Sequence, residues 1–227
     1  VILGDVLSAA YQQSQLSIGN FSARTVSVGD LFMGAIIPGF ILVLCYAIYV
    51  IIRAYISPKM APSQQVTIVS GRWKILLTSL LPPFILITSV LGSILLGVAT
   101  PTEAAGVGAL GAILLAVSKN SLTRANLTEA VETTTEITAM VFMILLGSSI
   151  FSLVFRGFGG DDLITGIFTE LPGGAFGAVL VVMVIIFLLG FILDFIQITL
   201  VVVPIVGPAL LMLGVDPIWL GIMIAIN

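Results

Sequence analysis

Residues 176–213 read FGAVLVVMVIIFLLGFILDFIQITLVVVPIVGPALLML, and this stretch decides the fold. It is almost entirely apolar and longer than the roughly 20 residues with which a helix crosses the hydrocarbon core of a membrane. No polar loop divides it into two spans. A charged residue at membrane depth costs on the order of 3 kcal/mol on insertion scales, so it usually has a function there. The residues that interrupt the apolar run are Gly190, Asp194, Gln197, Thr199, Pro204, Gly207 and Pro208.

The pattern around the interruption predicts two helical arms with a break between them. Gly190 is suited to end a helix. Asp194 has the pattern of an N-cap, and Gln197, three residues later, completes a capping box. We therefore expect a first arm over about 177–189, a break at Gly190–Asp194, and a second arm over 195–213 that its prolines kink. A break without loop residues that reach water is typical of a re-entrant hairpin.

Such a break creates a candidate site for ions or for a charged solute. The second arm would point its free N–H groups and the positive end of its dipole at the membrane midplane, and carbonyls released at the break could bind a cation. The candidate binding residues are Gly190, Asp194, Gln197 and Thr199, with a sodium ion near Asp194. The alternative interpretation is that Asp194 only caps a helix and pairs with a basic residue elsewhere.

The rest of the composition predicts an all-α polytopic membrane protein. The chain has 227 residues, of which 59% are hydrophobic and 8% charged. A soluble domain carries about 25% charged residues. The apolar residues gather in blocks near the length of a membrane span, which predicts four full spans in addition to the hairpin. These spans are 31–52, 75–98, 104–117 and 137–155.

Charged and polar residues divide the chain into segments and predict its orientation. The loop 53–74 holds four basic residues and no acidic residue, so the positive-inside rule places it in the cytoplasm. Basic residues after the third span agree with this assignment. The other expected segments are a polar leading segment 1–30, an amphipathic surface helix 124–136, an outer loop 156–175, the hairpin 176–213, and the start of a truncated helix 217–227.

Several stretches resemble one family, the large membrane subunit of tripartite ATP-independent periplasmic (TRAP) transporters. The run GVATPTEAA at 97–105 is similar to the family's signature. The order VGDLF at 28–32 followed by Pro38-Gly39 is similar to its entrance into a central span. The pair Leu193-Asp194, followed by Pro204 and then LGVDP at 213–217, is similar to its second re-entrant hairpin and the turn after it.

The resemblance implies sodium-coupled import of an organic acid across the bacterial inner membrane. It implies a small membrane subunit and a periplasmic solute-binding protein as partners, and an elevator-type fold with two inverted repeats. This chain would hold the second repeat, cut at both ends, and Asn227 would begin the approach to a second broken helix. Residues of about 8–25 resemble an insertion. The resemblance implies sodium as the coupling ion, and no cofactor or nucleic acid is expected.

The signature itself has an explanation as a helix start. Thr100 is suited to be an N-cap, Pro101 to be the first helical residue, and Glu103 to complete a capping box after Thr102. A structural role is therefore expected for these four residues, which leaves the hairpin as the candidate binding site.

Three alternatives to a carrier are a scaffold subunit, an intramembrane enzyme and a channel. A non-transporting scaffold or assembly subunit predicts continuous spans. An enzyme needs a nucleophile with a base, paired carboxylates or metal ligands, whereas the sequence has no histidine and Asp194 has no acidic partner in its apolar stretch. No nucleotide-binding loop is present, so ATP is not the direct drive in this chain. The sequence does not name the acid.

Overall fold

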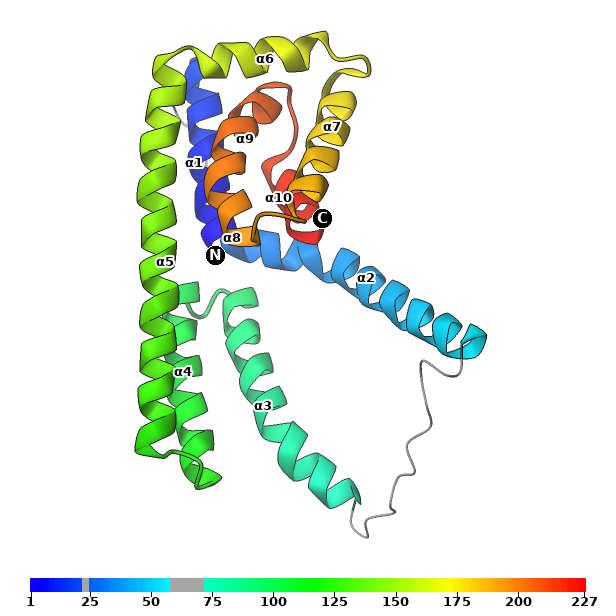
Figure 1. Cartoon of the computed structure of the whole chain (residues 1–227), viewed down its shortest axis with the longest axis vertical. Coiled ribbons are helices and arrows are strands. Elements are labelled where there is room, and N and C mark those ends of the chain that lie inside the picture. Colours follow the sequence, from blue (N-terminus) through cyan, green and yellow to red (C-terminus); the bar gives the residue numbers. More distant parts are fainter. Residues whose placement is uncertain (22–24, 58–71) are drawn as a thin grey trace. The chain divides into compact units, whose positions relative to one another are not determined.

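The computed structural model describes residues 1–21, 25–57 and 72–227, and for residues 72–76 it describes the backbone alone. Every regular element in these residues is helical (Figure 1). The helices are α1 (Ile2–Ser17), α2 (Val28–Ile56), α3 (Arg72–Leu95), α4 (Pro101–Ser118), α5 (Arg124–Gly157), α6 (Gly160–Glu170), α7 (Gly174–Leu189), α8 (Phe195–Gln197), the π-helical turn η2 (Ile198–Val202), α9 (Val203–Met212) and α10 (Pro217–Ile226).

The apolar helices confirm an all-α polytopic membrane protein. Five helices of the described chain are long and apolar enough to cross a membrane, or six if the bent pair α6–α7 counts as one span. Four of them cover the expected spans, and the fifth is the second arm of the hairpin, Phe195–Met212. Helix α3 ends before the expected residue 98 because Gly97 adopts a left-handed φ of 68°.

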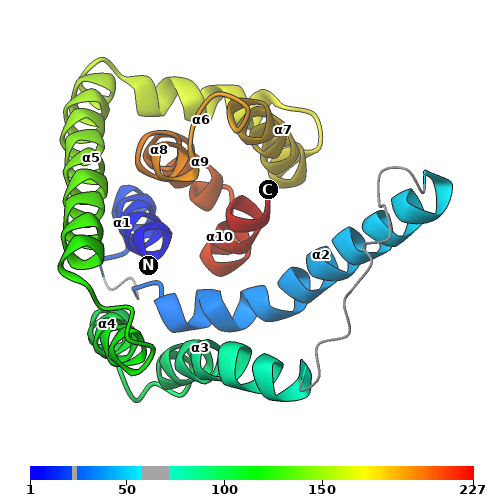
Figure 2. The same ribbon diagram turned by 60° about the horizontal axis from the view of Figure 1, so that its bottom comes forward.

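The helices form two compact units, residues 1–34 with 128–227 and residues 35–127. The first unit contains α1, α6, the hairpin arms and α10. In both views α9 lies between α1 and α7 (Figures 1 and 2), and the three helices are in contact in that order. The largest completely buried side chains of its core are Leu7, Val182, Val203, Leu210 and Leu220.

Two glycines allow this core to pack closely. A Cβ atom at Gly207 of α9 would lie 3.3 Å from the Cβ of Ala10 in α1. A Cβ at Gly221 of α10 would lie 2.6 Å from methyl groups of both Leu7 and Leu31. Small residues at helix contacts let backbones approach in a membrane, where packing supplies most of the driving force for association. The hairpin arm α9 is therefore held against α1, and α10 against α1 and the start of α2.

The leading segment differs from the expectation of a polar stretch over 1–30. Residues Ile2–Ser17 form α1, and its side chains Leu3, Leu7 and Ala10 are buried in the core. Their spacing places them on one face of a helix, on which Ser14 is also buried. A prediction from the mixed composition of 1–30 misses this helix because it does not take account of the spacing of its apolar residues.

The regions on either side of the fourth expected span also differ from the sequence-based expectation. Helix α5 runs without a break through both the expected surface helix 124–136 and the span, since no glycine or proline lies between Arg124 and Leu146. The expected outer loop 156–175 is largely the helix α6, which meets α7 at an angle of 115°. Gly159 and Gly173, both with positive φ, form the turns at its two ends.

The second unit is built around the antiparallel contact of α3 and α4. A Cβ at Gly108 of α4 would lie 3.3 Å from Val90 of α3. The Nζ of Lys119 donates a 2.9 Å hydrogen bond to the carbonyl oxygen of Thr78 at the other end of the pair. Helix α2 contributes residues 35–56 to this unit and has no buried residue along its whole length.

Candidate functional site

The chain forms two apolar helical arms with a break between them over residues 190–194. The first arm is α7, and the second arm consists of α8, η2 and α9, which together form one apolar helix of 18 residues. At a rise of 1.5 Å per residue the arms are about 24 and about 27 Å long. Both are shorter than the hydrocarbon core of about 30 Å. These lengths suit a re-entrant hairpin, which remains a prediction for the membrane-embedded protein.

The second arm begins with the predicted capping box. The backbone of Asp194 is extended, and its carboxylate accepts a 3.4 Å hydrogen bond from the N–H of Ile196. The N–H of Asp194 in turn donates to the Oε1 of Gln197 over 3.2 Å. The carboxylate therefore already occupies the positive end of this helix. An anionic solute would meet the Asp194 carboxylate at this end of the helix.

The break releases carbonyl groups. The N–H groups of residues 190–193 donate back to carbonyls of the last turn of α7, such as Gly190 to Ile186 and Leu193 to Leu189. Among the described residues, none donates a hydrogen bond to the carbonyl oxygens of residues 190–193. Buried carbonyls without a donor are costly in a membrane unless they line a cavity or bind an ion. These four oxygens belong to the residues directly before Asp194 in the sequence, of which Gly190, Phe191 and Leu193 line a cavity.

A second irregularity lies just inside the second arm. In η2 the N–H of Val203 donates to the carbonyl of Ile198, five residues back, and Pro204 has no N–H to offer. The carbonyl of Thr199 consequently lacks the N–H of Val203, which a regular α-helix would supply, and Pro204 cannot supply the N–H that would continue the π-helical pattern. The side chain of Thr199 is completely buried, and its Oγ1 has no hydrogen-bond partner within the described part of the chain. π-Helical turns of this kind are frequent at functional sites.

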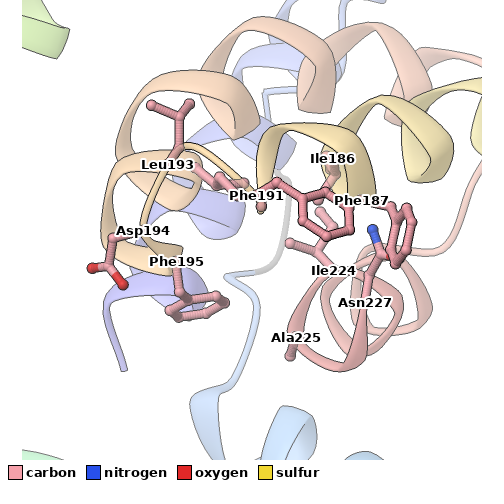
Figure 3. Close-up of a pocket in the computed structure, with 11 residues that line it drawn as sticks. Ile186, Phe187, Phe191, Leu193, Asp194, Phe195, Ile224, Ala225 and Asn227 are labelled. Atoms are coloured by element: carbon pink, nitrogen blue, oxygen red, sulfur yellow. The ribbon is translucent and has the colours of Figure 1, made fainter.

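A cavity of about 380 Å³ adjoins the break. Figure 3 shows that the rings of Phe187 and Phe191 lie beside Asn227 on one side, whereas Phe195 and Asp194 lie on the other side. The carboxylate of Asp194 points away from the rings of Phe187 and Phe191. The lining residues are Ile186, Phe187, Gly190, Phe191, Leu193, Asp194, Phe195, Ile198, Ile224, Ala225 and Asn227.

Three of the five predicted site residues line the cavity. Gly190, Asp194 and Asn227 line it, whereas Gln197 and Thr199 do not. Asn227 is tied to the first arm, since its Nδ2 donates a 2.9 Å hydrogen bond to the carbonyl oxygen of Met183. Sequence reasoning missed this bond and the aromatic lining. The spacing of Phe187, Phe191 and Phe195, four residues apart, was the signal that could have indicated the lining.

The polar groups of the cavity favour a cation. Its lining contains one carboxylate and one amide, and it contains no lysine or arginine among the described residues. Main-chain carbonyls and a carboxylate at a helix break are the groups with which secondary transporters bind sodium. No group of three or more His, Cys, Asp and Glu side chains suited to a metal ion occurs in the residues described.

The signature residues form the predicted helix start. The Oγ1 of Thr100 accepts from the N–H of Glu103, and a carboxylate oxygen of Glu103 accepts a 2.8 Å hydrogen bond from the N–H of Thr100. Pro101 is the first residue of α4, and Thr102 follows it. These residues belong to the unit 35–127. The capping box accounts for the residue types of the signature without a bound ligand.

Comparison with known proteins identifies the family. Residues 16–227 match the sequence profile described as tripartite ATP-independent periplasmic transporter, DctM component. The chain belongs to the DctM family. Family membership makes it a component of a transporter rather than an enzyme, and places it as a multi-pass protein in the bacterial inner membrane. The predicted cytoplasmic loop 53–74 lies mostly outside the described residues.

Curated relatives of this DctM-family chain carry several different substrate names. The sialic acid TRAP transporter large permease protein SiaM of Vibrio cholerae is 29% identical over 209 residues, which cover 88% of this chain and 47% of SiaM. The C4-dicarboxylate large permease protein DctM of Pseudomonas aeruginosa is 28% identical, with 91% and 48% covered. The ectoine large permease protein TeaC of Halomonas elongata is 29% identical, with 88% and 47% covered.

The DctM-family chain spans about half the length of the curated relatives it matches. No solved structure matches it.

Proposed function

We propose that this chain is part of a subunit that imports an organic acid across the bacterial inner membrane by sodium symport. Family membership supports transport, and the relatives named for sialic acid and C4-dicarboxylates support a carboxylate-bearing solute. One structural observation carries the coupling to sodium. The hairpin breaks at Gly190–Asp194 and leaves four carbonyls without a donor beside a carboxylate.

The same observation favours a carrier over a scaffold. A subunit that only assembles a complex has no need for an apolar arm with unpaired backbone oxygens, a π-helical turn and a buried hydroxyl without a partner. Each of these features costs stability, and proteins retain such costs chiefly at functional sites. A small membrane subunit and a periplasmic solute-binding protein are the proposed partners, because the family's name describes a tripartite periplasmic transporter. An elevator movement of the hairpin is part of the same proposal.

Sodium would act as a cotransported ion near Asp194. The carbonyls of the lining residues Gly190, Phe191 and Leu193, which accept no hydrogen bond within the described residues, and the Asp194 carboxylate would supply oxygen ligands on the hairpin side. The negative charge of Asp194 lacks a basic partner among the described residues that line the cavity. A bound cation would compensate that charge at membrane depth. Ion binding and solute binding would then depend on the same break.

The test is uptake into proteoliposomes that contain the full-length subunit, its small membrane partner and the cognate solute-binding protein. Wild type is compared with Asp194→Asn, in the presence and absence of an inward sodium gradient. We expect uptake to require sodium and to fall at least tenfold in the variant. The control is Asp216→Asn, which makes the same change at the N-cap of α10, outside the cavity, where the carboxylate accepts a 2.9 Å bond from Trp219.

The outcomes separate the coupling from the capping role. Uptake without a sodium gradient would contradict the coupling of transport to sodium. Full activity of Asp194→Asn would leave Asp194 as a cap only, since asparagine caps helices about as well as aspartate. Equal loss in both variants would indicate damage to folding. Sodium-dependent uptake that is lost in Asp194→Asn and kept in Asp216→Asn would support the symporter.

A further inference from the structure

Helix α6 is packed into the bundle that holds the hairpin. It runs across the ends of α1, α9 and α7 (Figure 1) and packs on both α7 and α9. Phe168 is buried in the core of this bundle, and Ile164 and Leu171 pack against that core. The Nε2 of Gln13 in α1 donates a 3.1 Å hydrogen bond to the Oδ2 of Asp161 in the first turn of α6. Helix α6 is therefore fixed both to the hairpin and to α1.

Helix α5, which precedes α6 directly, is joined to this bundle much more loosely. Within the described residues, α5 shares no comparable packing with α1, α7 or α9. A cavity of about 190 Å³ lies between its C-terminal half and the facing parts of α1 and the second arm, with Leu145 and Ser149 on one side and Ala9 and Pro204 on the other. The boundary between the loosely held helix and the packed bundle thus falls between α5 and α6.

The connection 157–160 between these helices has unusual backbone freedom. Three of its four residues are glycines, Gly157, Gly159 and Gly160. Gly159 has a φ of 76°, and a Cβ atom at Gly157 or at Gly159 would meet no atom within 4 Å. Glycine adopts more backbone conformations than any other residue, and hinges are a few positions at the ends of elements that absorb changes in φ and ψ.

The corner 171–174 between α6 and α7 also contains glycines, but close contacts restrict it. A Cβ at Gly177 would overlap the carbonyl oxygen of Pro172, and a Cβ at Gly173 would lie 3.4 Å from the backbone of Gly177. Helices α6 and α7 are moreover packed on each other. A rotation at this corner would have to separate α6 from the core of the bundle, whereas a rotation at 157–160 would not.

Only side-chain contacts that are easily broken hold the connection 157–160 in its observed conformation. The ring of Phe155 lies where a Cβ of Gly160 would be placed. The Nε of Arg156 lies 3.8 Å from the Oδ2 of Asp161, and the two side chains are 41% and 37% exposed. Ion pairs with this exposure contribute little to stability. The connection can therefore open at low cost while the bond from Gln13 keeps α6 on α1.

We propose that the connection 157–160 is the hinge on which the hairpin moves during transport, and that α6 moves with the hairpin as one rigid body. The proposal rests on the proposed function, because a carrier has to move its binding site, and it names the position at which the chain bends. Asp161 is a positioning residue that fixes α6 to α1, and its ion pair with Arg156 closes the hinge in the observed conformation.

Distances between spin labels test the hinge without any solute. The labels are attached to a cysteine-free full-length subunit, which includes Cys45→Ser, in lipid nanodiscs with its small membrane partner. One pair joins Met143 of α5 to Thr169 of α6 and spans 157–160, and the other joins Thr169 to Leu188 of α7 and spans 171–174. All three side chains are exposed. Electron–electron double resonance is measured in sodium chloride and in potassium chloride.

We expect the distances of the first pair to shift between the two salts or to show two maxima, and those of the second pair to keep one maximum at the same position. Movement of the second pair alone would place the hinge at 171–174 and overturn the proposal. Movement of both pairs would show that α6 is not fixed to the hairpin. Absence of movement in both pairs would show that the connection 157–160 is rigid.

A matched pair of glycine variants assigns the movement to the connection. Gly157→Ala should narrow the distribution of the first label pair, since alanine restricts the backbone there. Gly166→Ala is the control, because Gly166 lies inside α6 and a Cβ there would also meet no atom within 4 Å. Thermal unfolding shows that both variants are folded. Equal distributions in the two variants would overturn the role of Gly157 in the hinge.

Uptake in the proteoliposome assay separates this proposal from the proposed function. A reducible bifunctional thiol reagent bridges Val154→Cys to Leu163→Cys, which line one cavity across the hinge, or Thr165→Cys to Met212→Cys, which line one cavity between α6 and α9. The first bridge should lower sodium-driven uptake of succinate or sialic acid at least tenfold until it is reduced, and the second should leave most of it.

Unchanged uptake with the first bridge, or its loss with the second, would overturn the hinge and leave the symporter standing. If the unbridged protein accumulates neither acid with sodium, the proposed function fails, while the label distances still decide where the chain bends.

Discussion

Asn227 and Met183 lie 44 positions apart in the sequence, yet the Nδ2 of Asn227 donates a 2.9 Å hydrogen bond to the carbonyl oxygen of Met183. The bond joins α10 to the middle of the first hairpin arm. Helices packed in a membrane lack a strong hydrophobic drive toward one another, so such bonds and close packing fix their positions. The bond therefore holds Asn227, which lines the cavity, against the first arm.

Replacing Asn227 by leucine removes this bond at similar size. We expect the free energy of unfolding to fall by about 1 kcal/mol, the usual net contribution of one hydrogen bond. The measurement is thermal unfolding of the full-length subunit in detergent. Asn126→Leu is the control, since the Asn126 side chain donates to the carbonyl of Ser121, only five residues back. A variant at Asn227 as stable as wild type would show that the bond contributes nothing to the packing of α10.

Asp194→Ala should lower the stability of the protein, whereas Asp194→Asn should not. Alanine cannot accept the hydrogen bond from the N–H of Ile196, and loss of an N-cap costs about 1 kcal/mol. Asparagine keeps an acceptor but removes the charge. We expect unfolding in the absence of sodium to distinguish only alanine from wild type, and stabilisation by added sodium to be lost in both variants. Sodium stabilisation that survives in both would contradict a role of Asp194 in the ion site.

Thr199→Val should stabilise the protein. The hydroxyl of Thr199 is buried without a partner, and such a group costs about 1–3 kcal/mol. Valine has a similar shape and no polar atom, so unfolding should require more denaturant. Thr165→Val is the control, because the Thr165 hydroxyl donates a 2.8 Å bond to the carbonyl of Asp161 and its loss should bring no gain. Destabilisation by Thr199→Val would show that the hydroxyl is satisfied in the membrane-embedded protein.

Gly221→Ala should destabilise the unit that holds the hairpin. The added methyl would meet Leu7 and Leu31 at 2.6 Å, and overpacking of a core costs about 1–3 kcal/mol. Gly106→Ala in α4 is the matched control, since no atom outside its own helix lies within 4 Å of that position. Alanine there should leave stability unchanged or raise it slightly. Equal unfolding temperatures for the two variants would contradict the close packing of α10 against α1 and α2.

Glu103→Gln should leave sodium-driven uptake intact. Glutamine completes a capping box as glutamate does, because its amide oxygen can accept from the N–H of Thr100. Thr100→Ala removes the other half of the box and should lower the unfolding temperature, whereas Thr100→Ser should not. Uptake is measured in the proteoliposome assay. Loss of uptake in Glu103→Gln at normal stability would assign the carboxylate a role beyond the helix start.

The hairpin was predictable because its signals are local. Gly190, Asp194 and Gln197 lie within eight residues, and the capping box they indicate depends only on neighbouring backbone groups. The spans were predictable for a similar reason, since length and apolarity alone decide whether a helix suits a membrane. The same logic failed at 124–136, where polarity suggested a separate surface helix and the absence of a breaker gave one continuous helix.

No local pattern in the sequence indicates which residues pack against each arm of the hairpin. The burial of α1, the bond from Asn227 to Met183 and the aromatic lining all join segments far apart in the chain. Thr199 also looked like one of several polar residues near the tip, and only packing shows that its hydroxyl is enclosed without a partner.

The sequence by itself determined a polytopic helical membrane chain, a hairpin broken at Gly190–Asp194, and two capping boxes. These follow from composition and from contacts within one helical turn, which do not depend on distant parts of the chain. Only the tertiary structure decided that Gly190, Asp194 and Asn227 line one cavity while Gln197 and Thr199 do not. Side-chain packing between distant helices selects those neighbours, and it depends on shape across the whole core rather than on residue order.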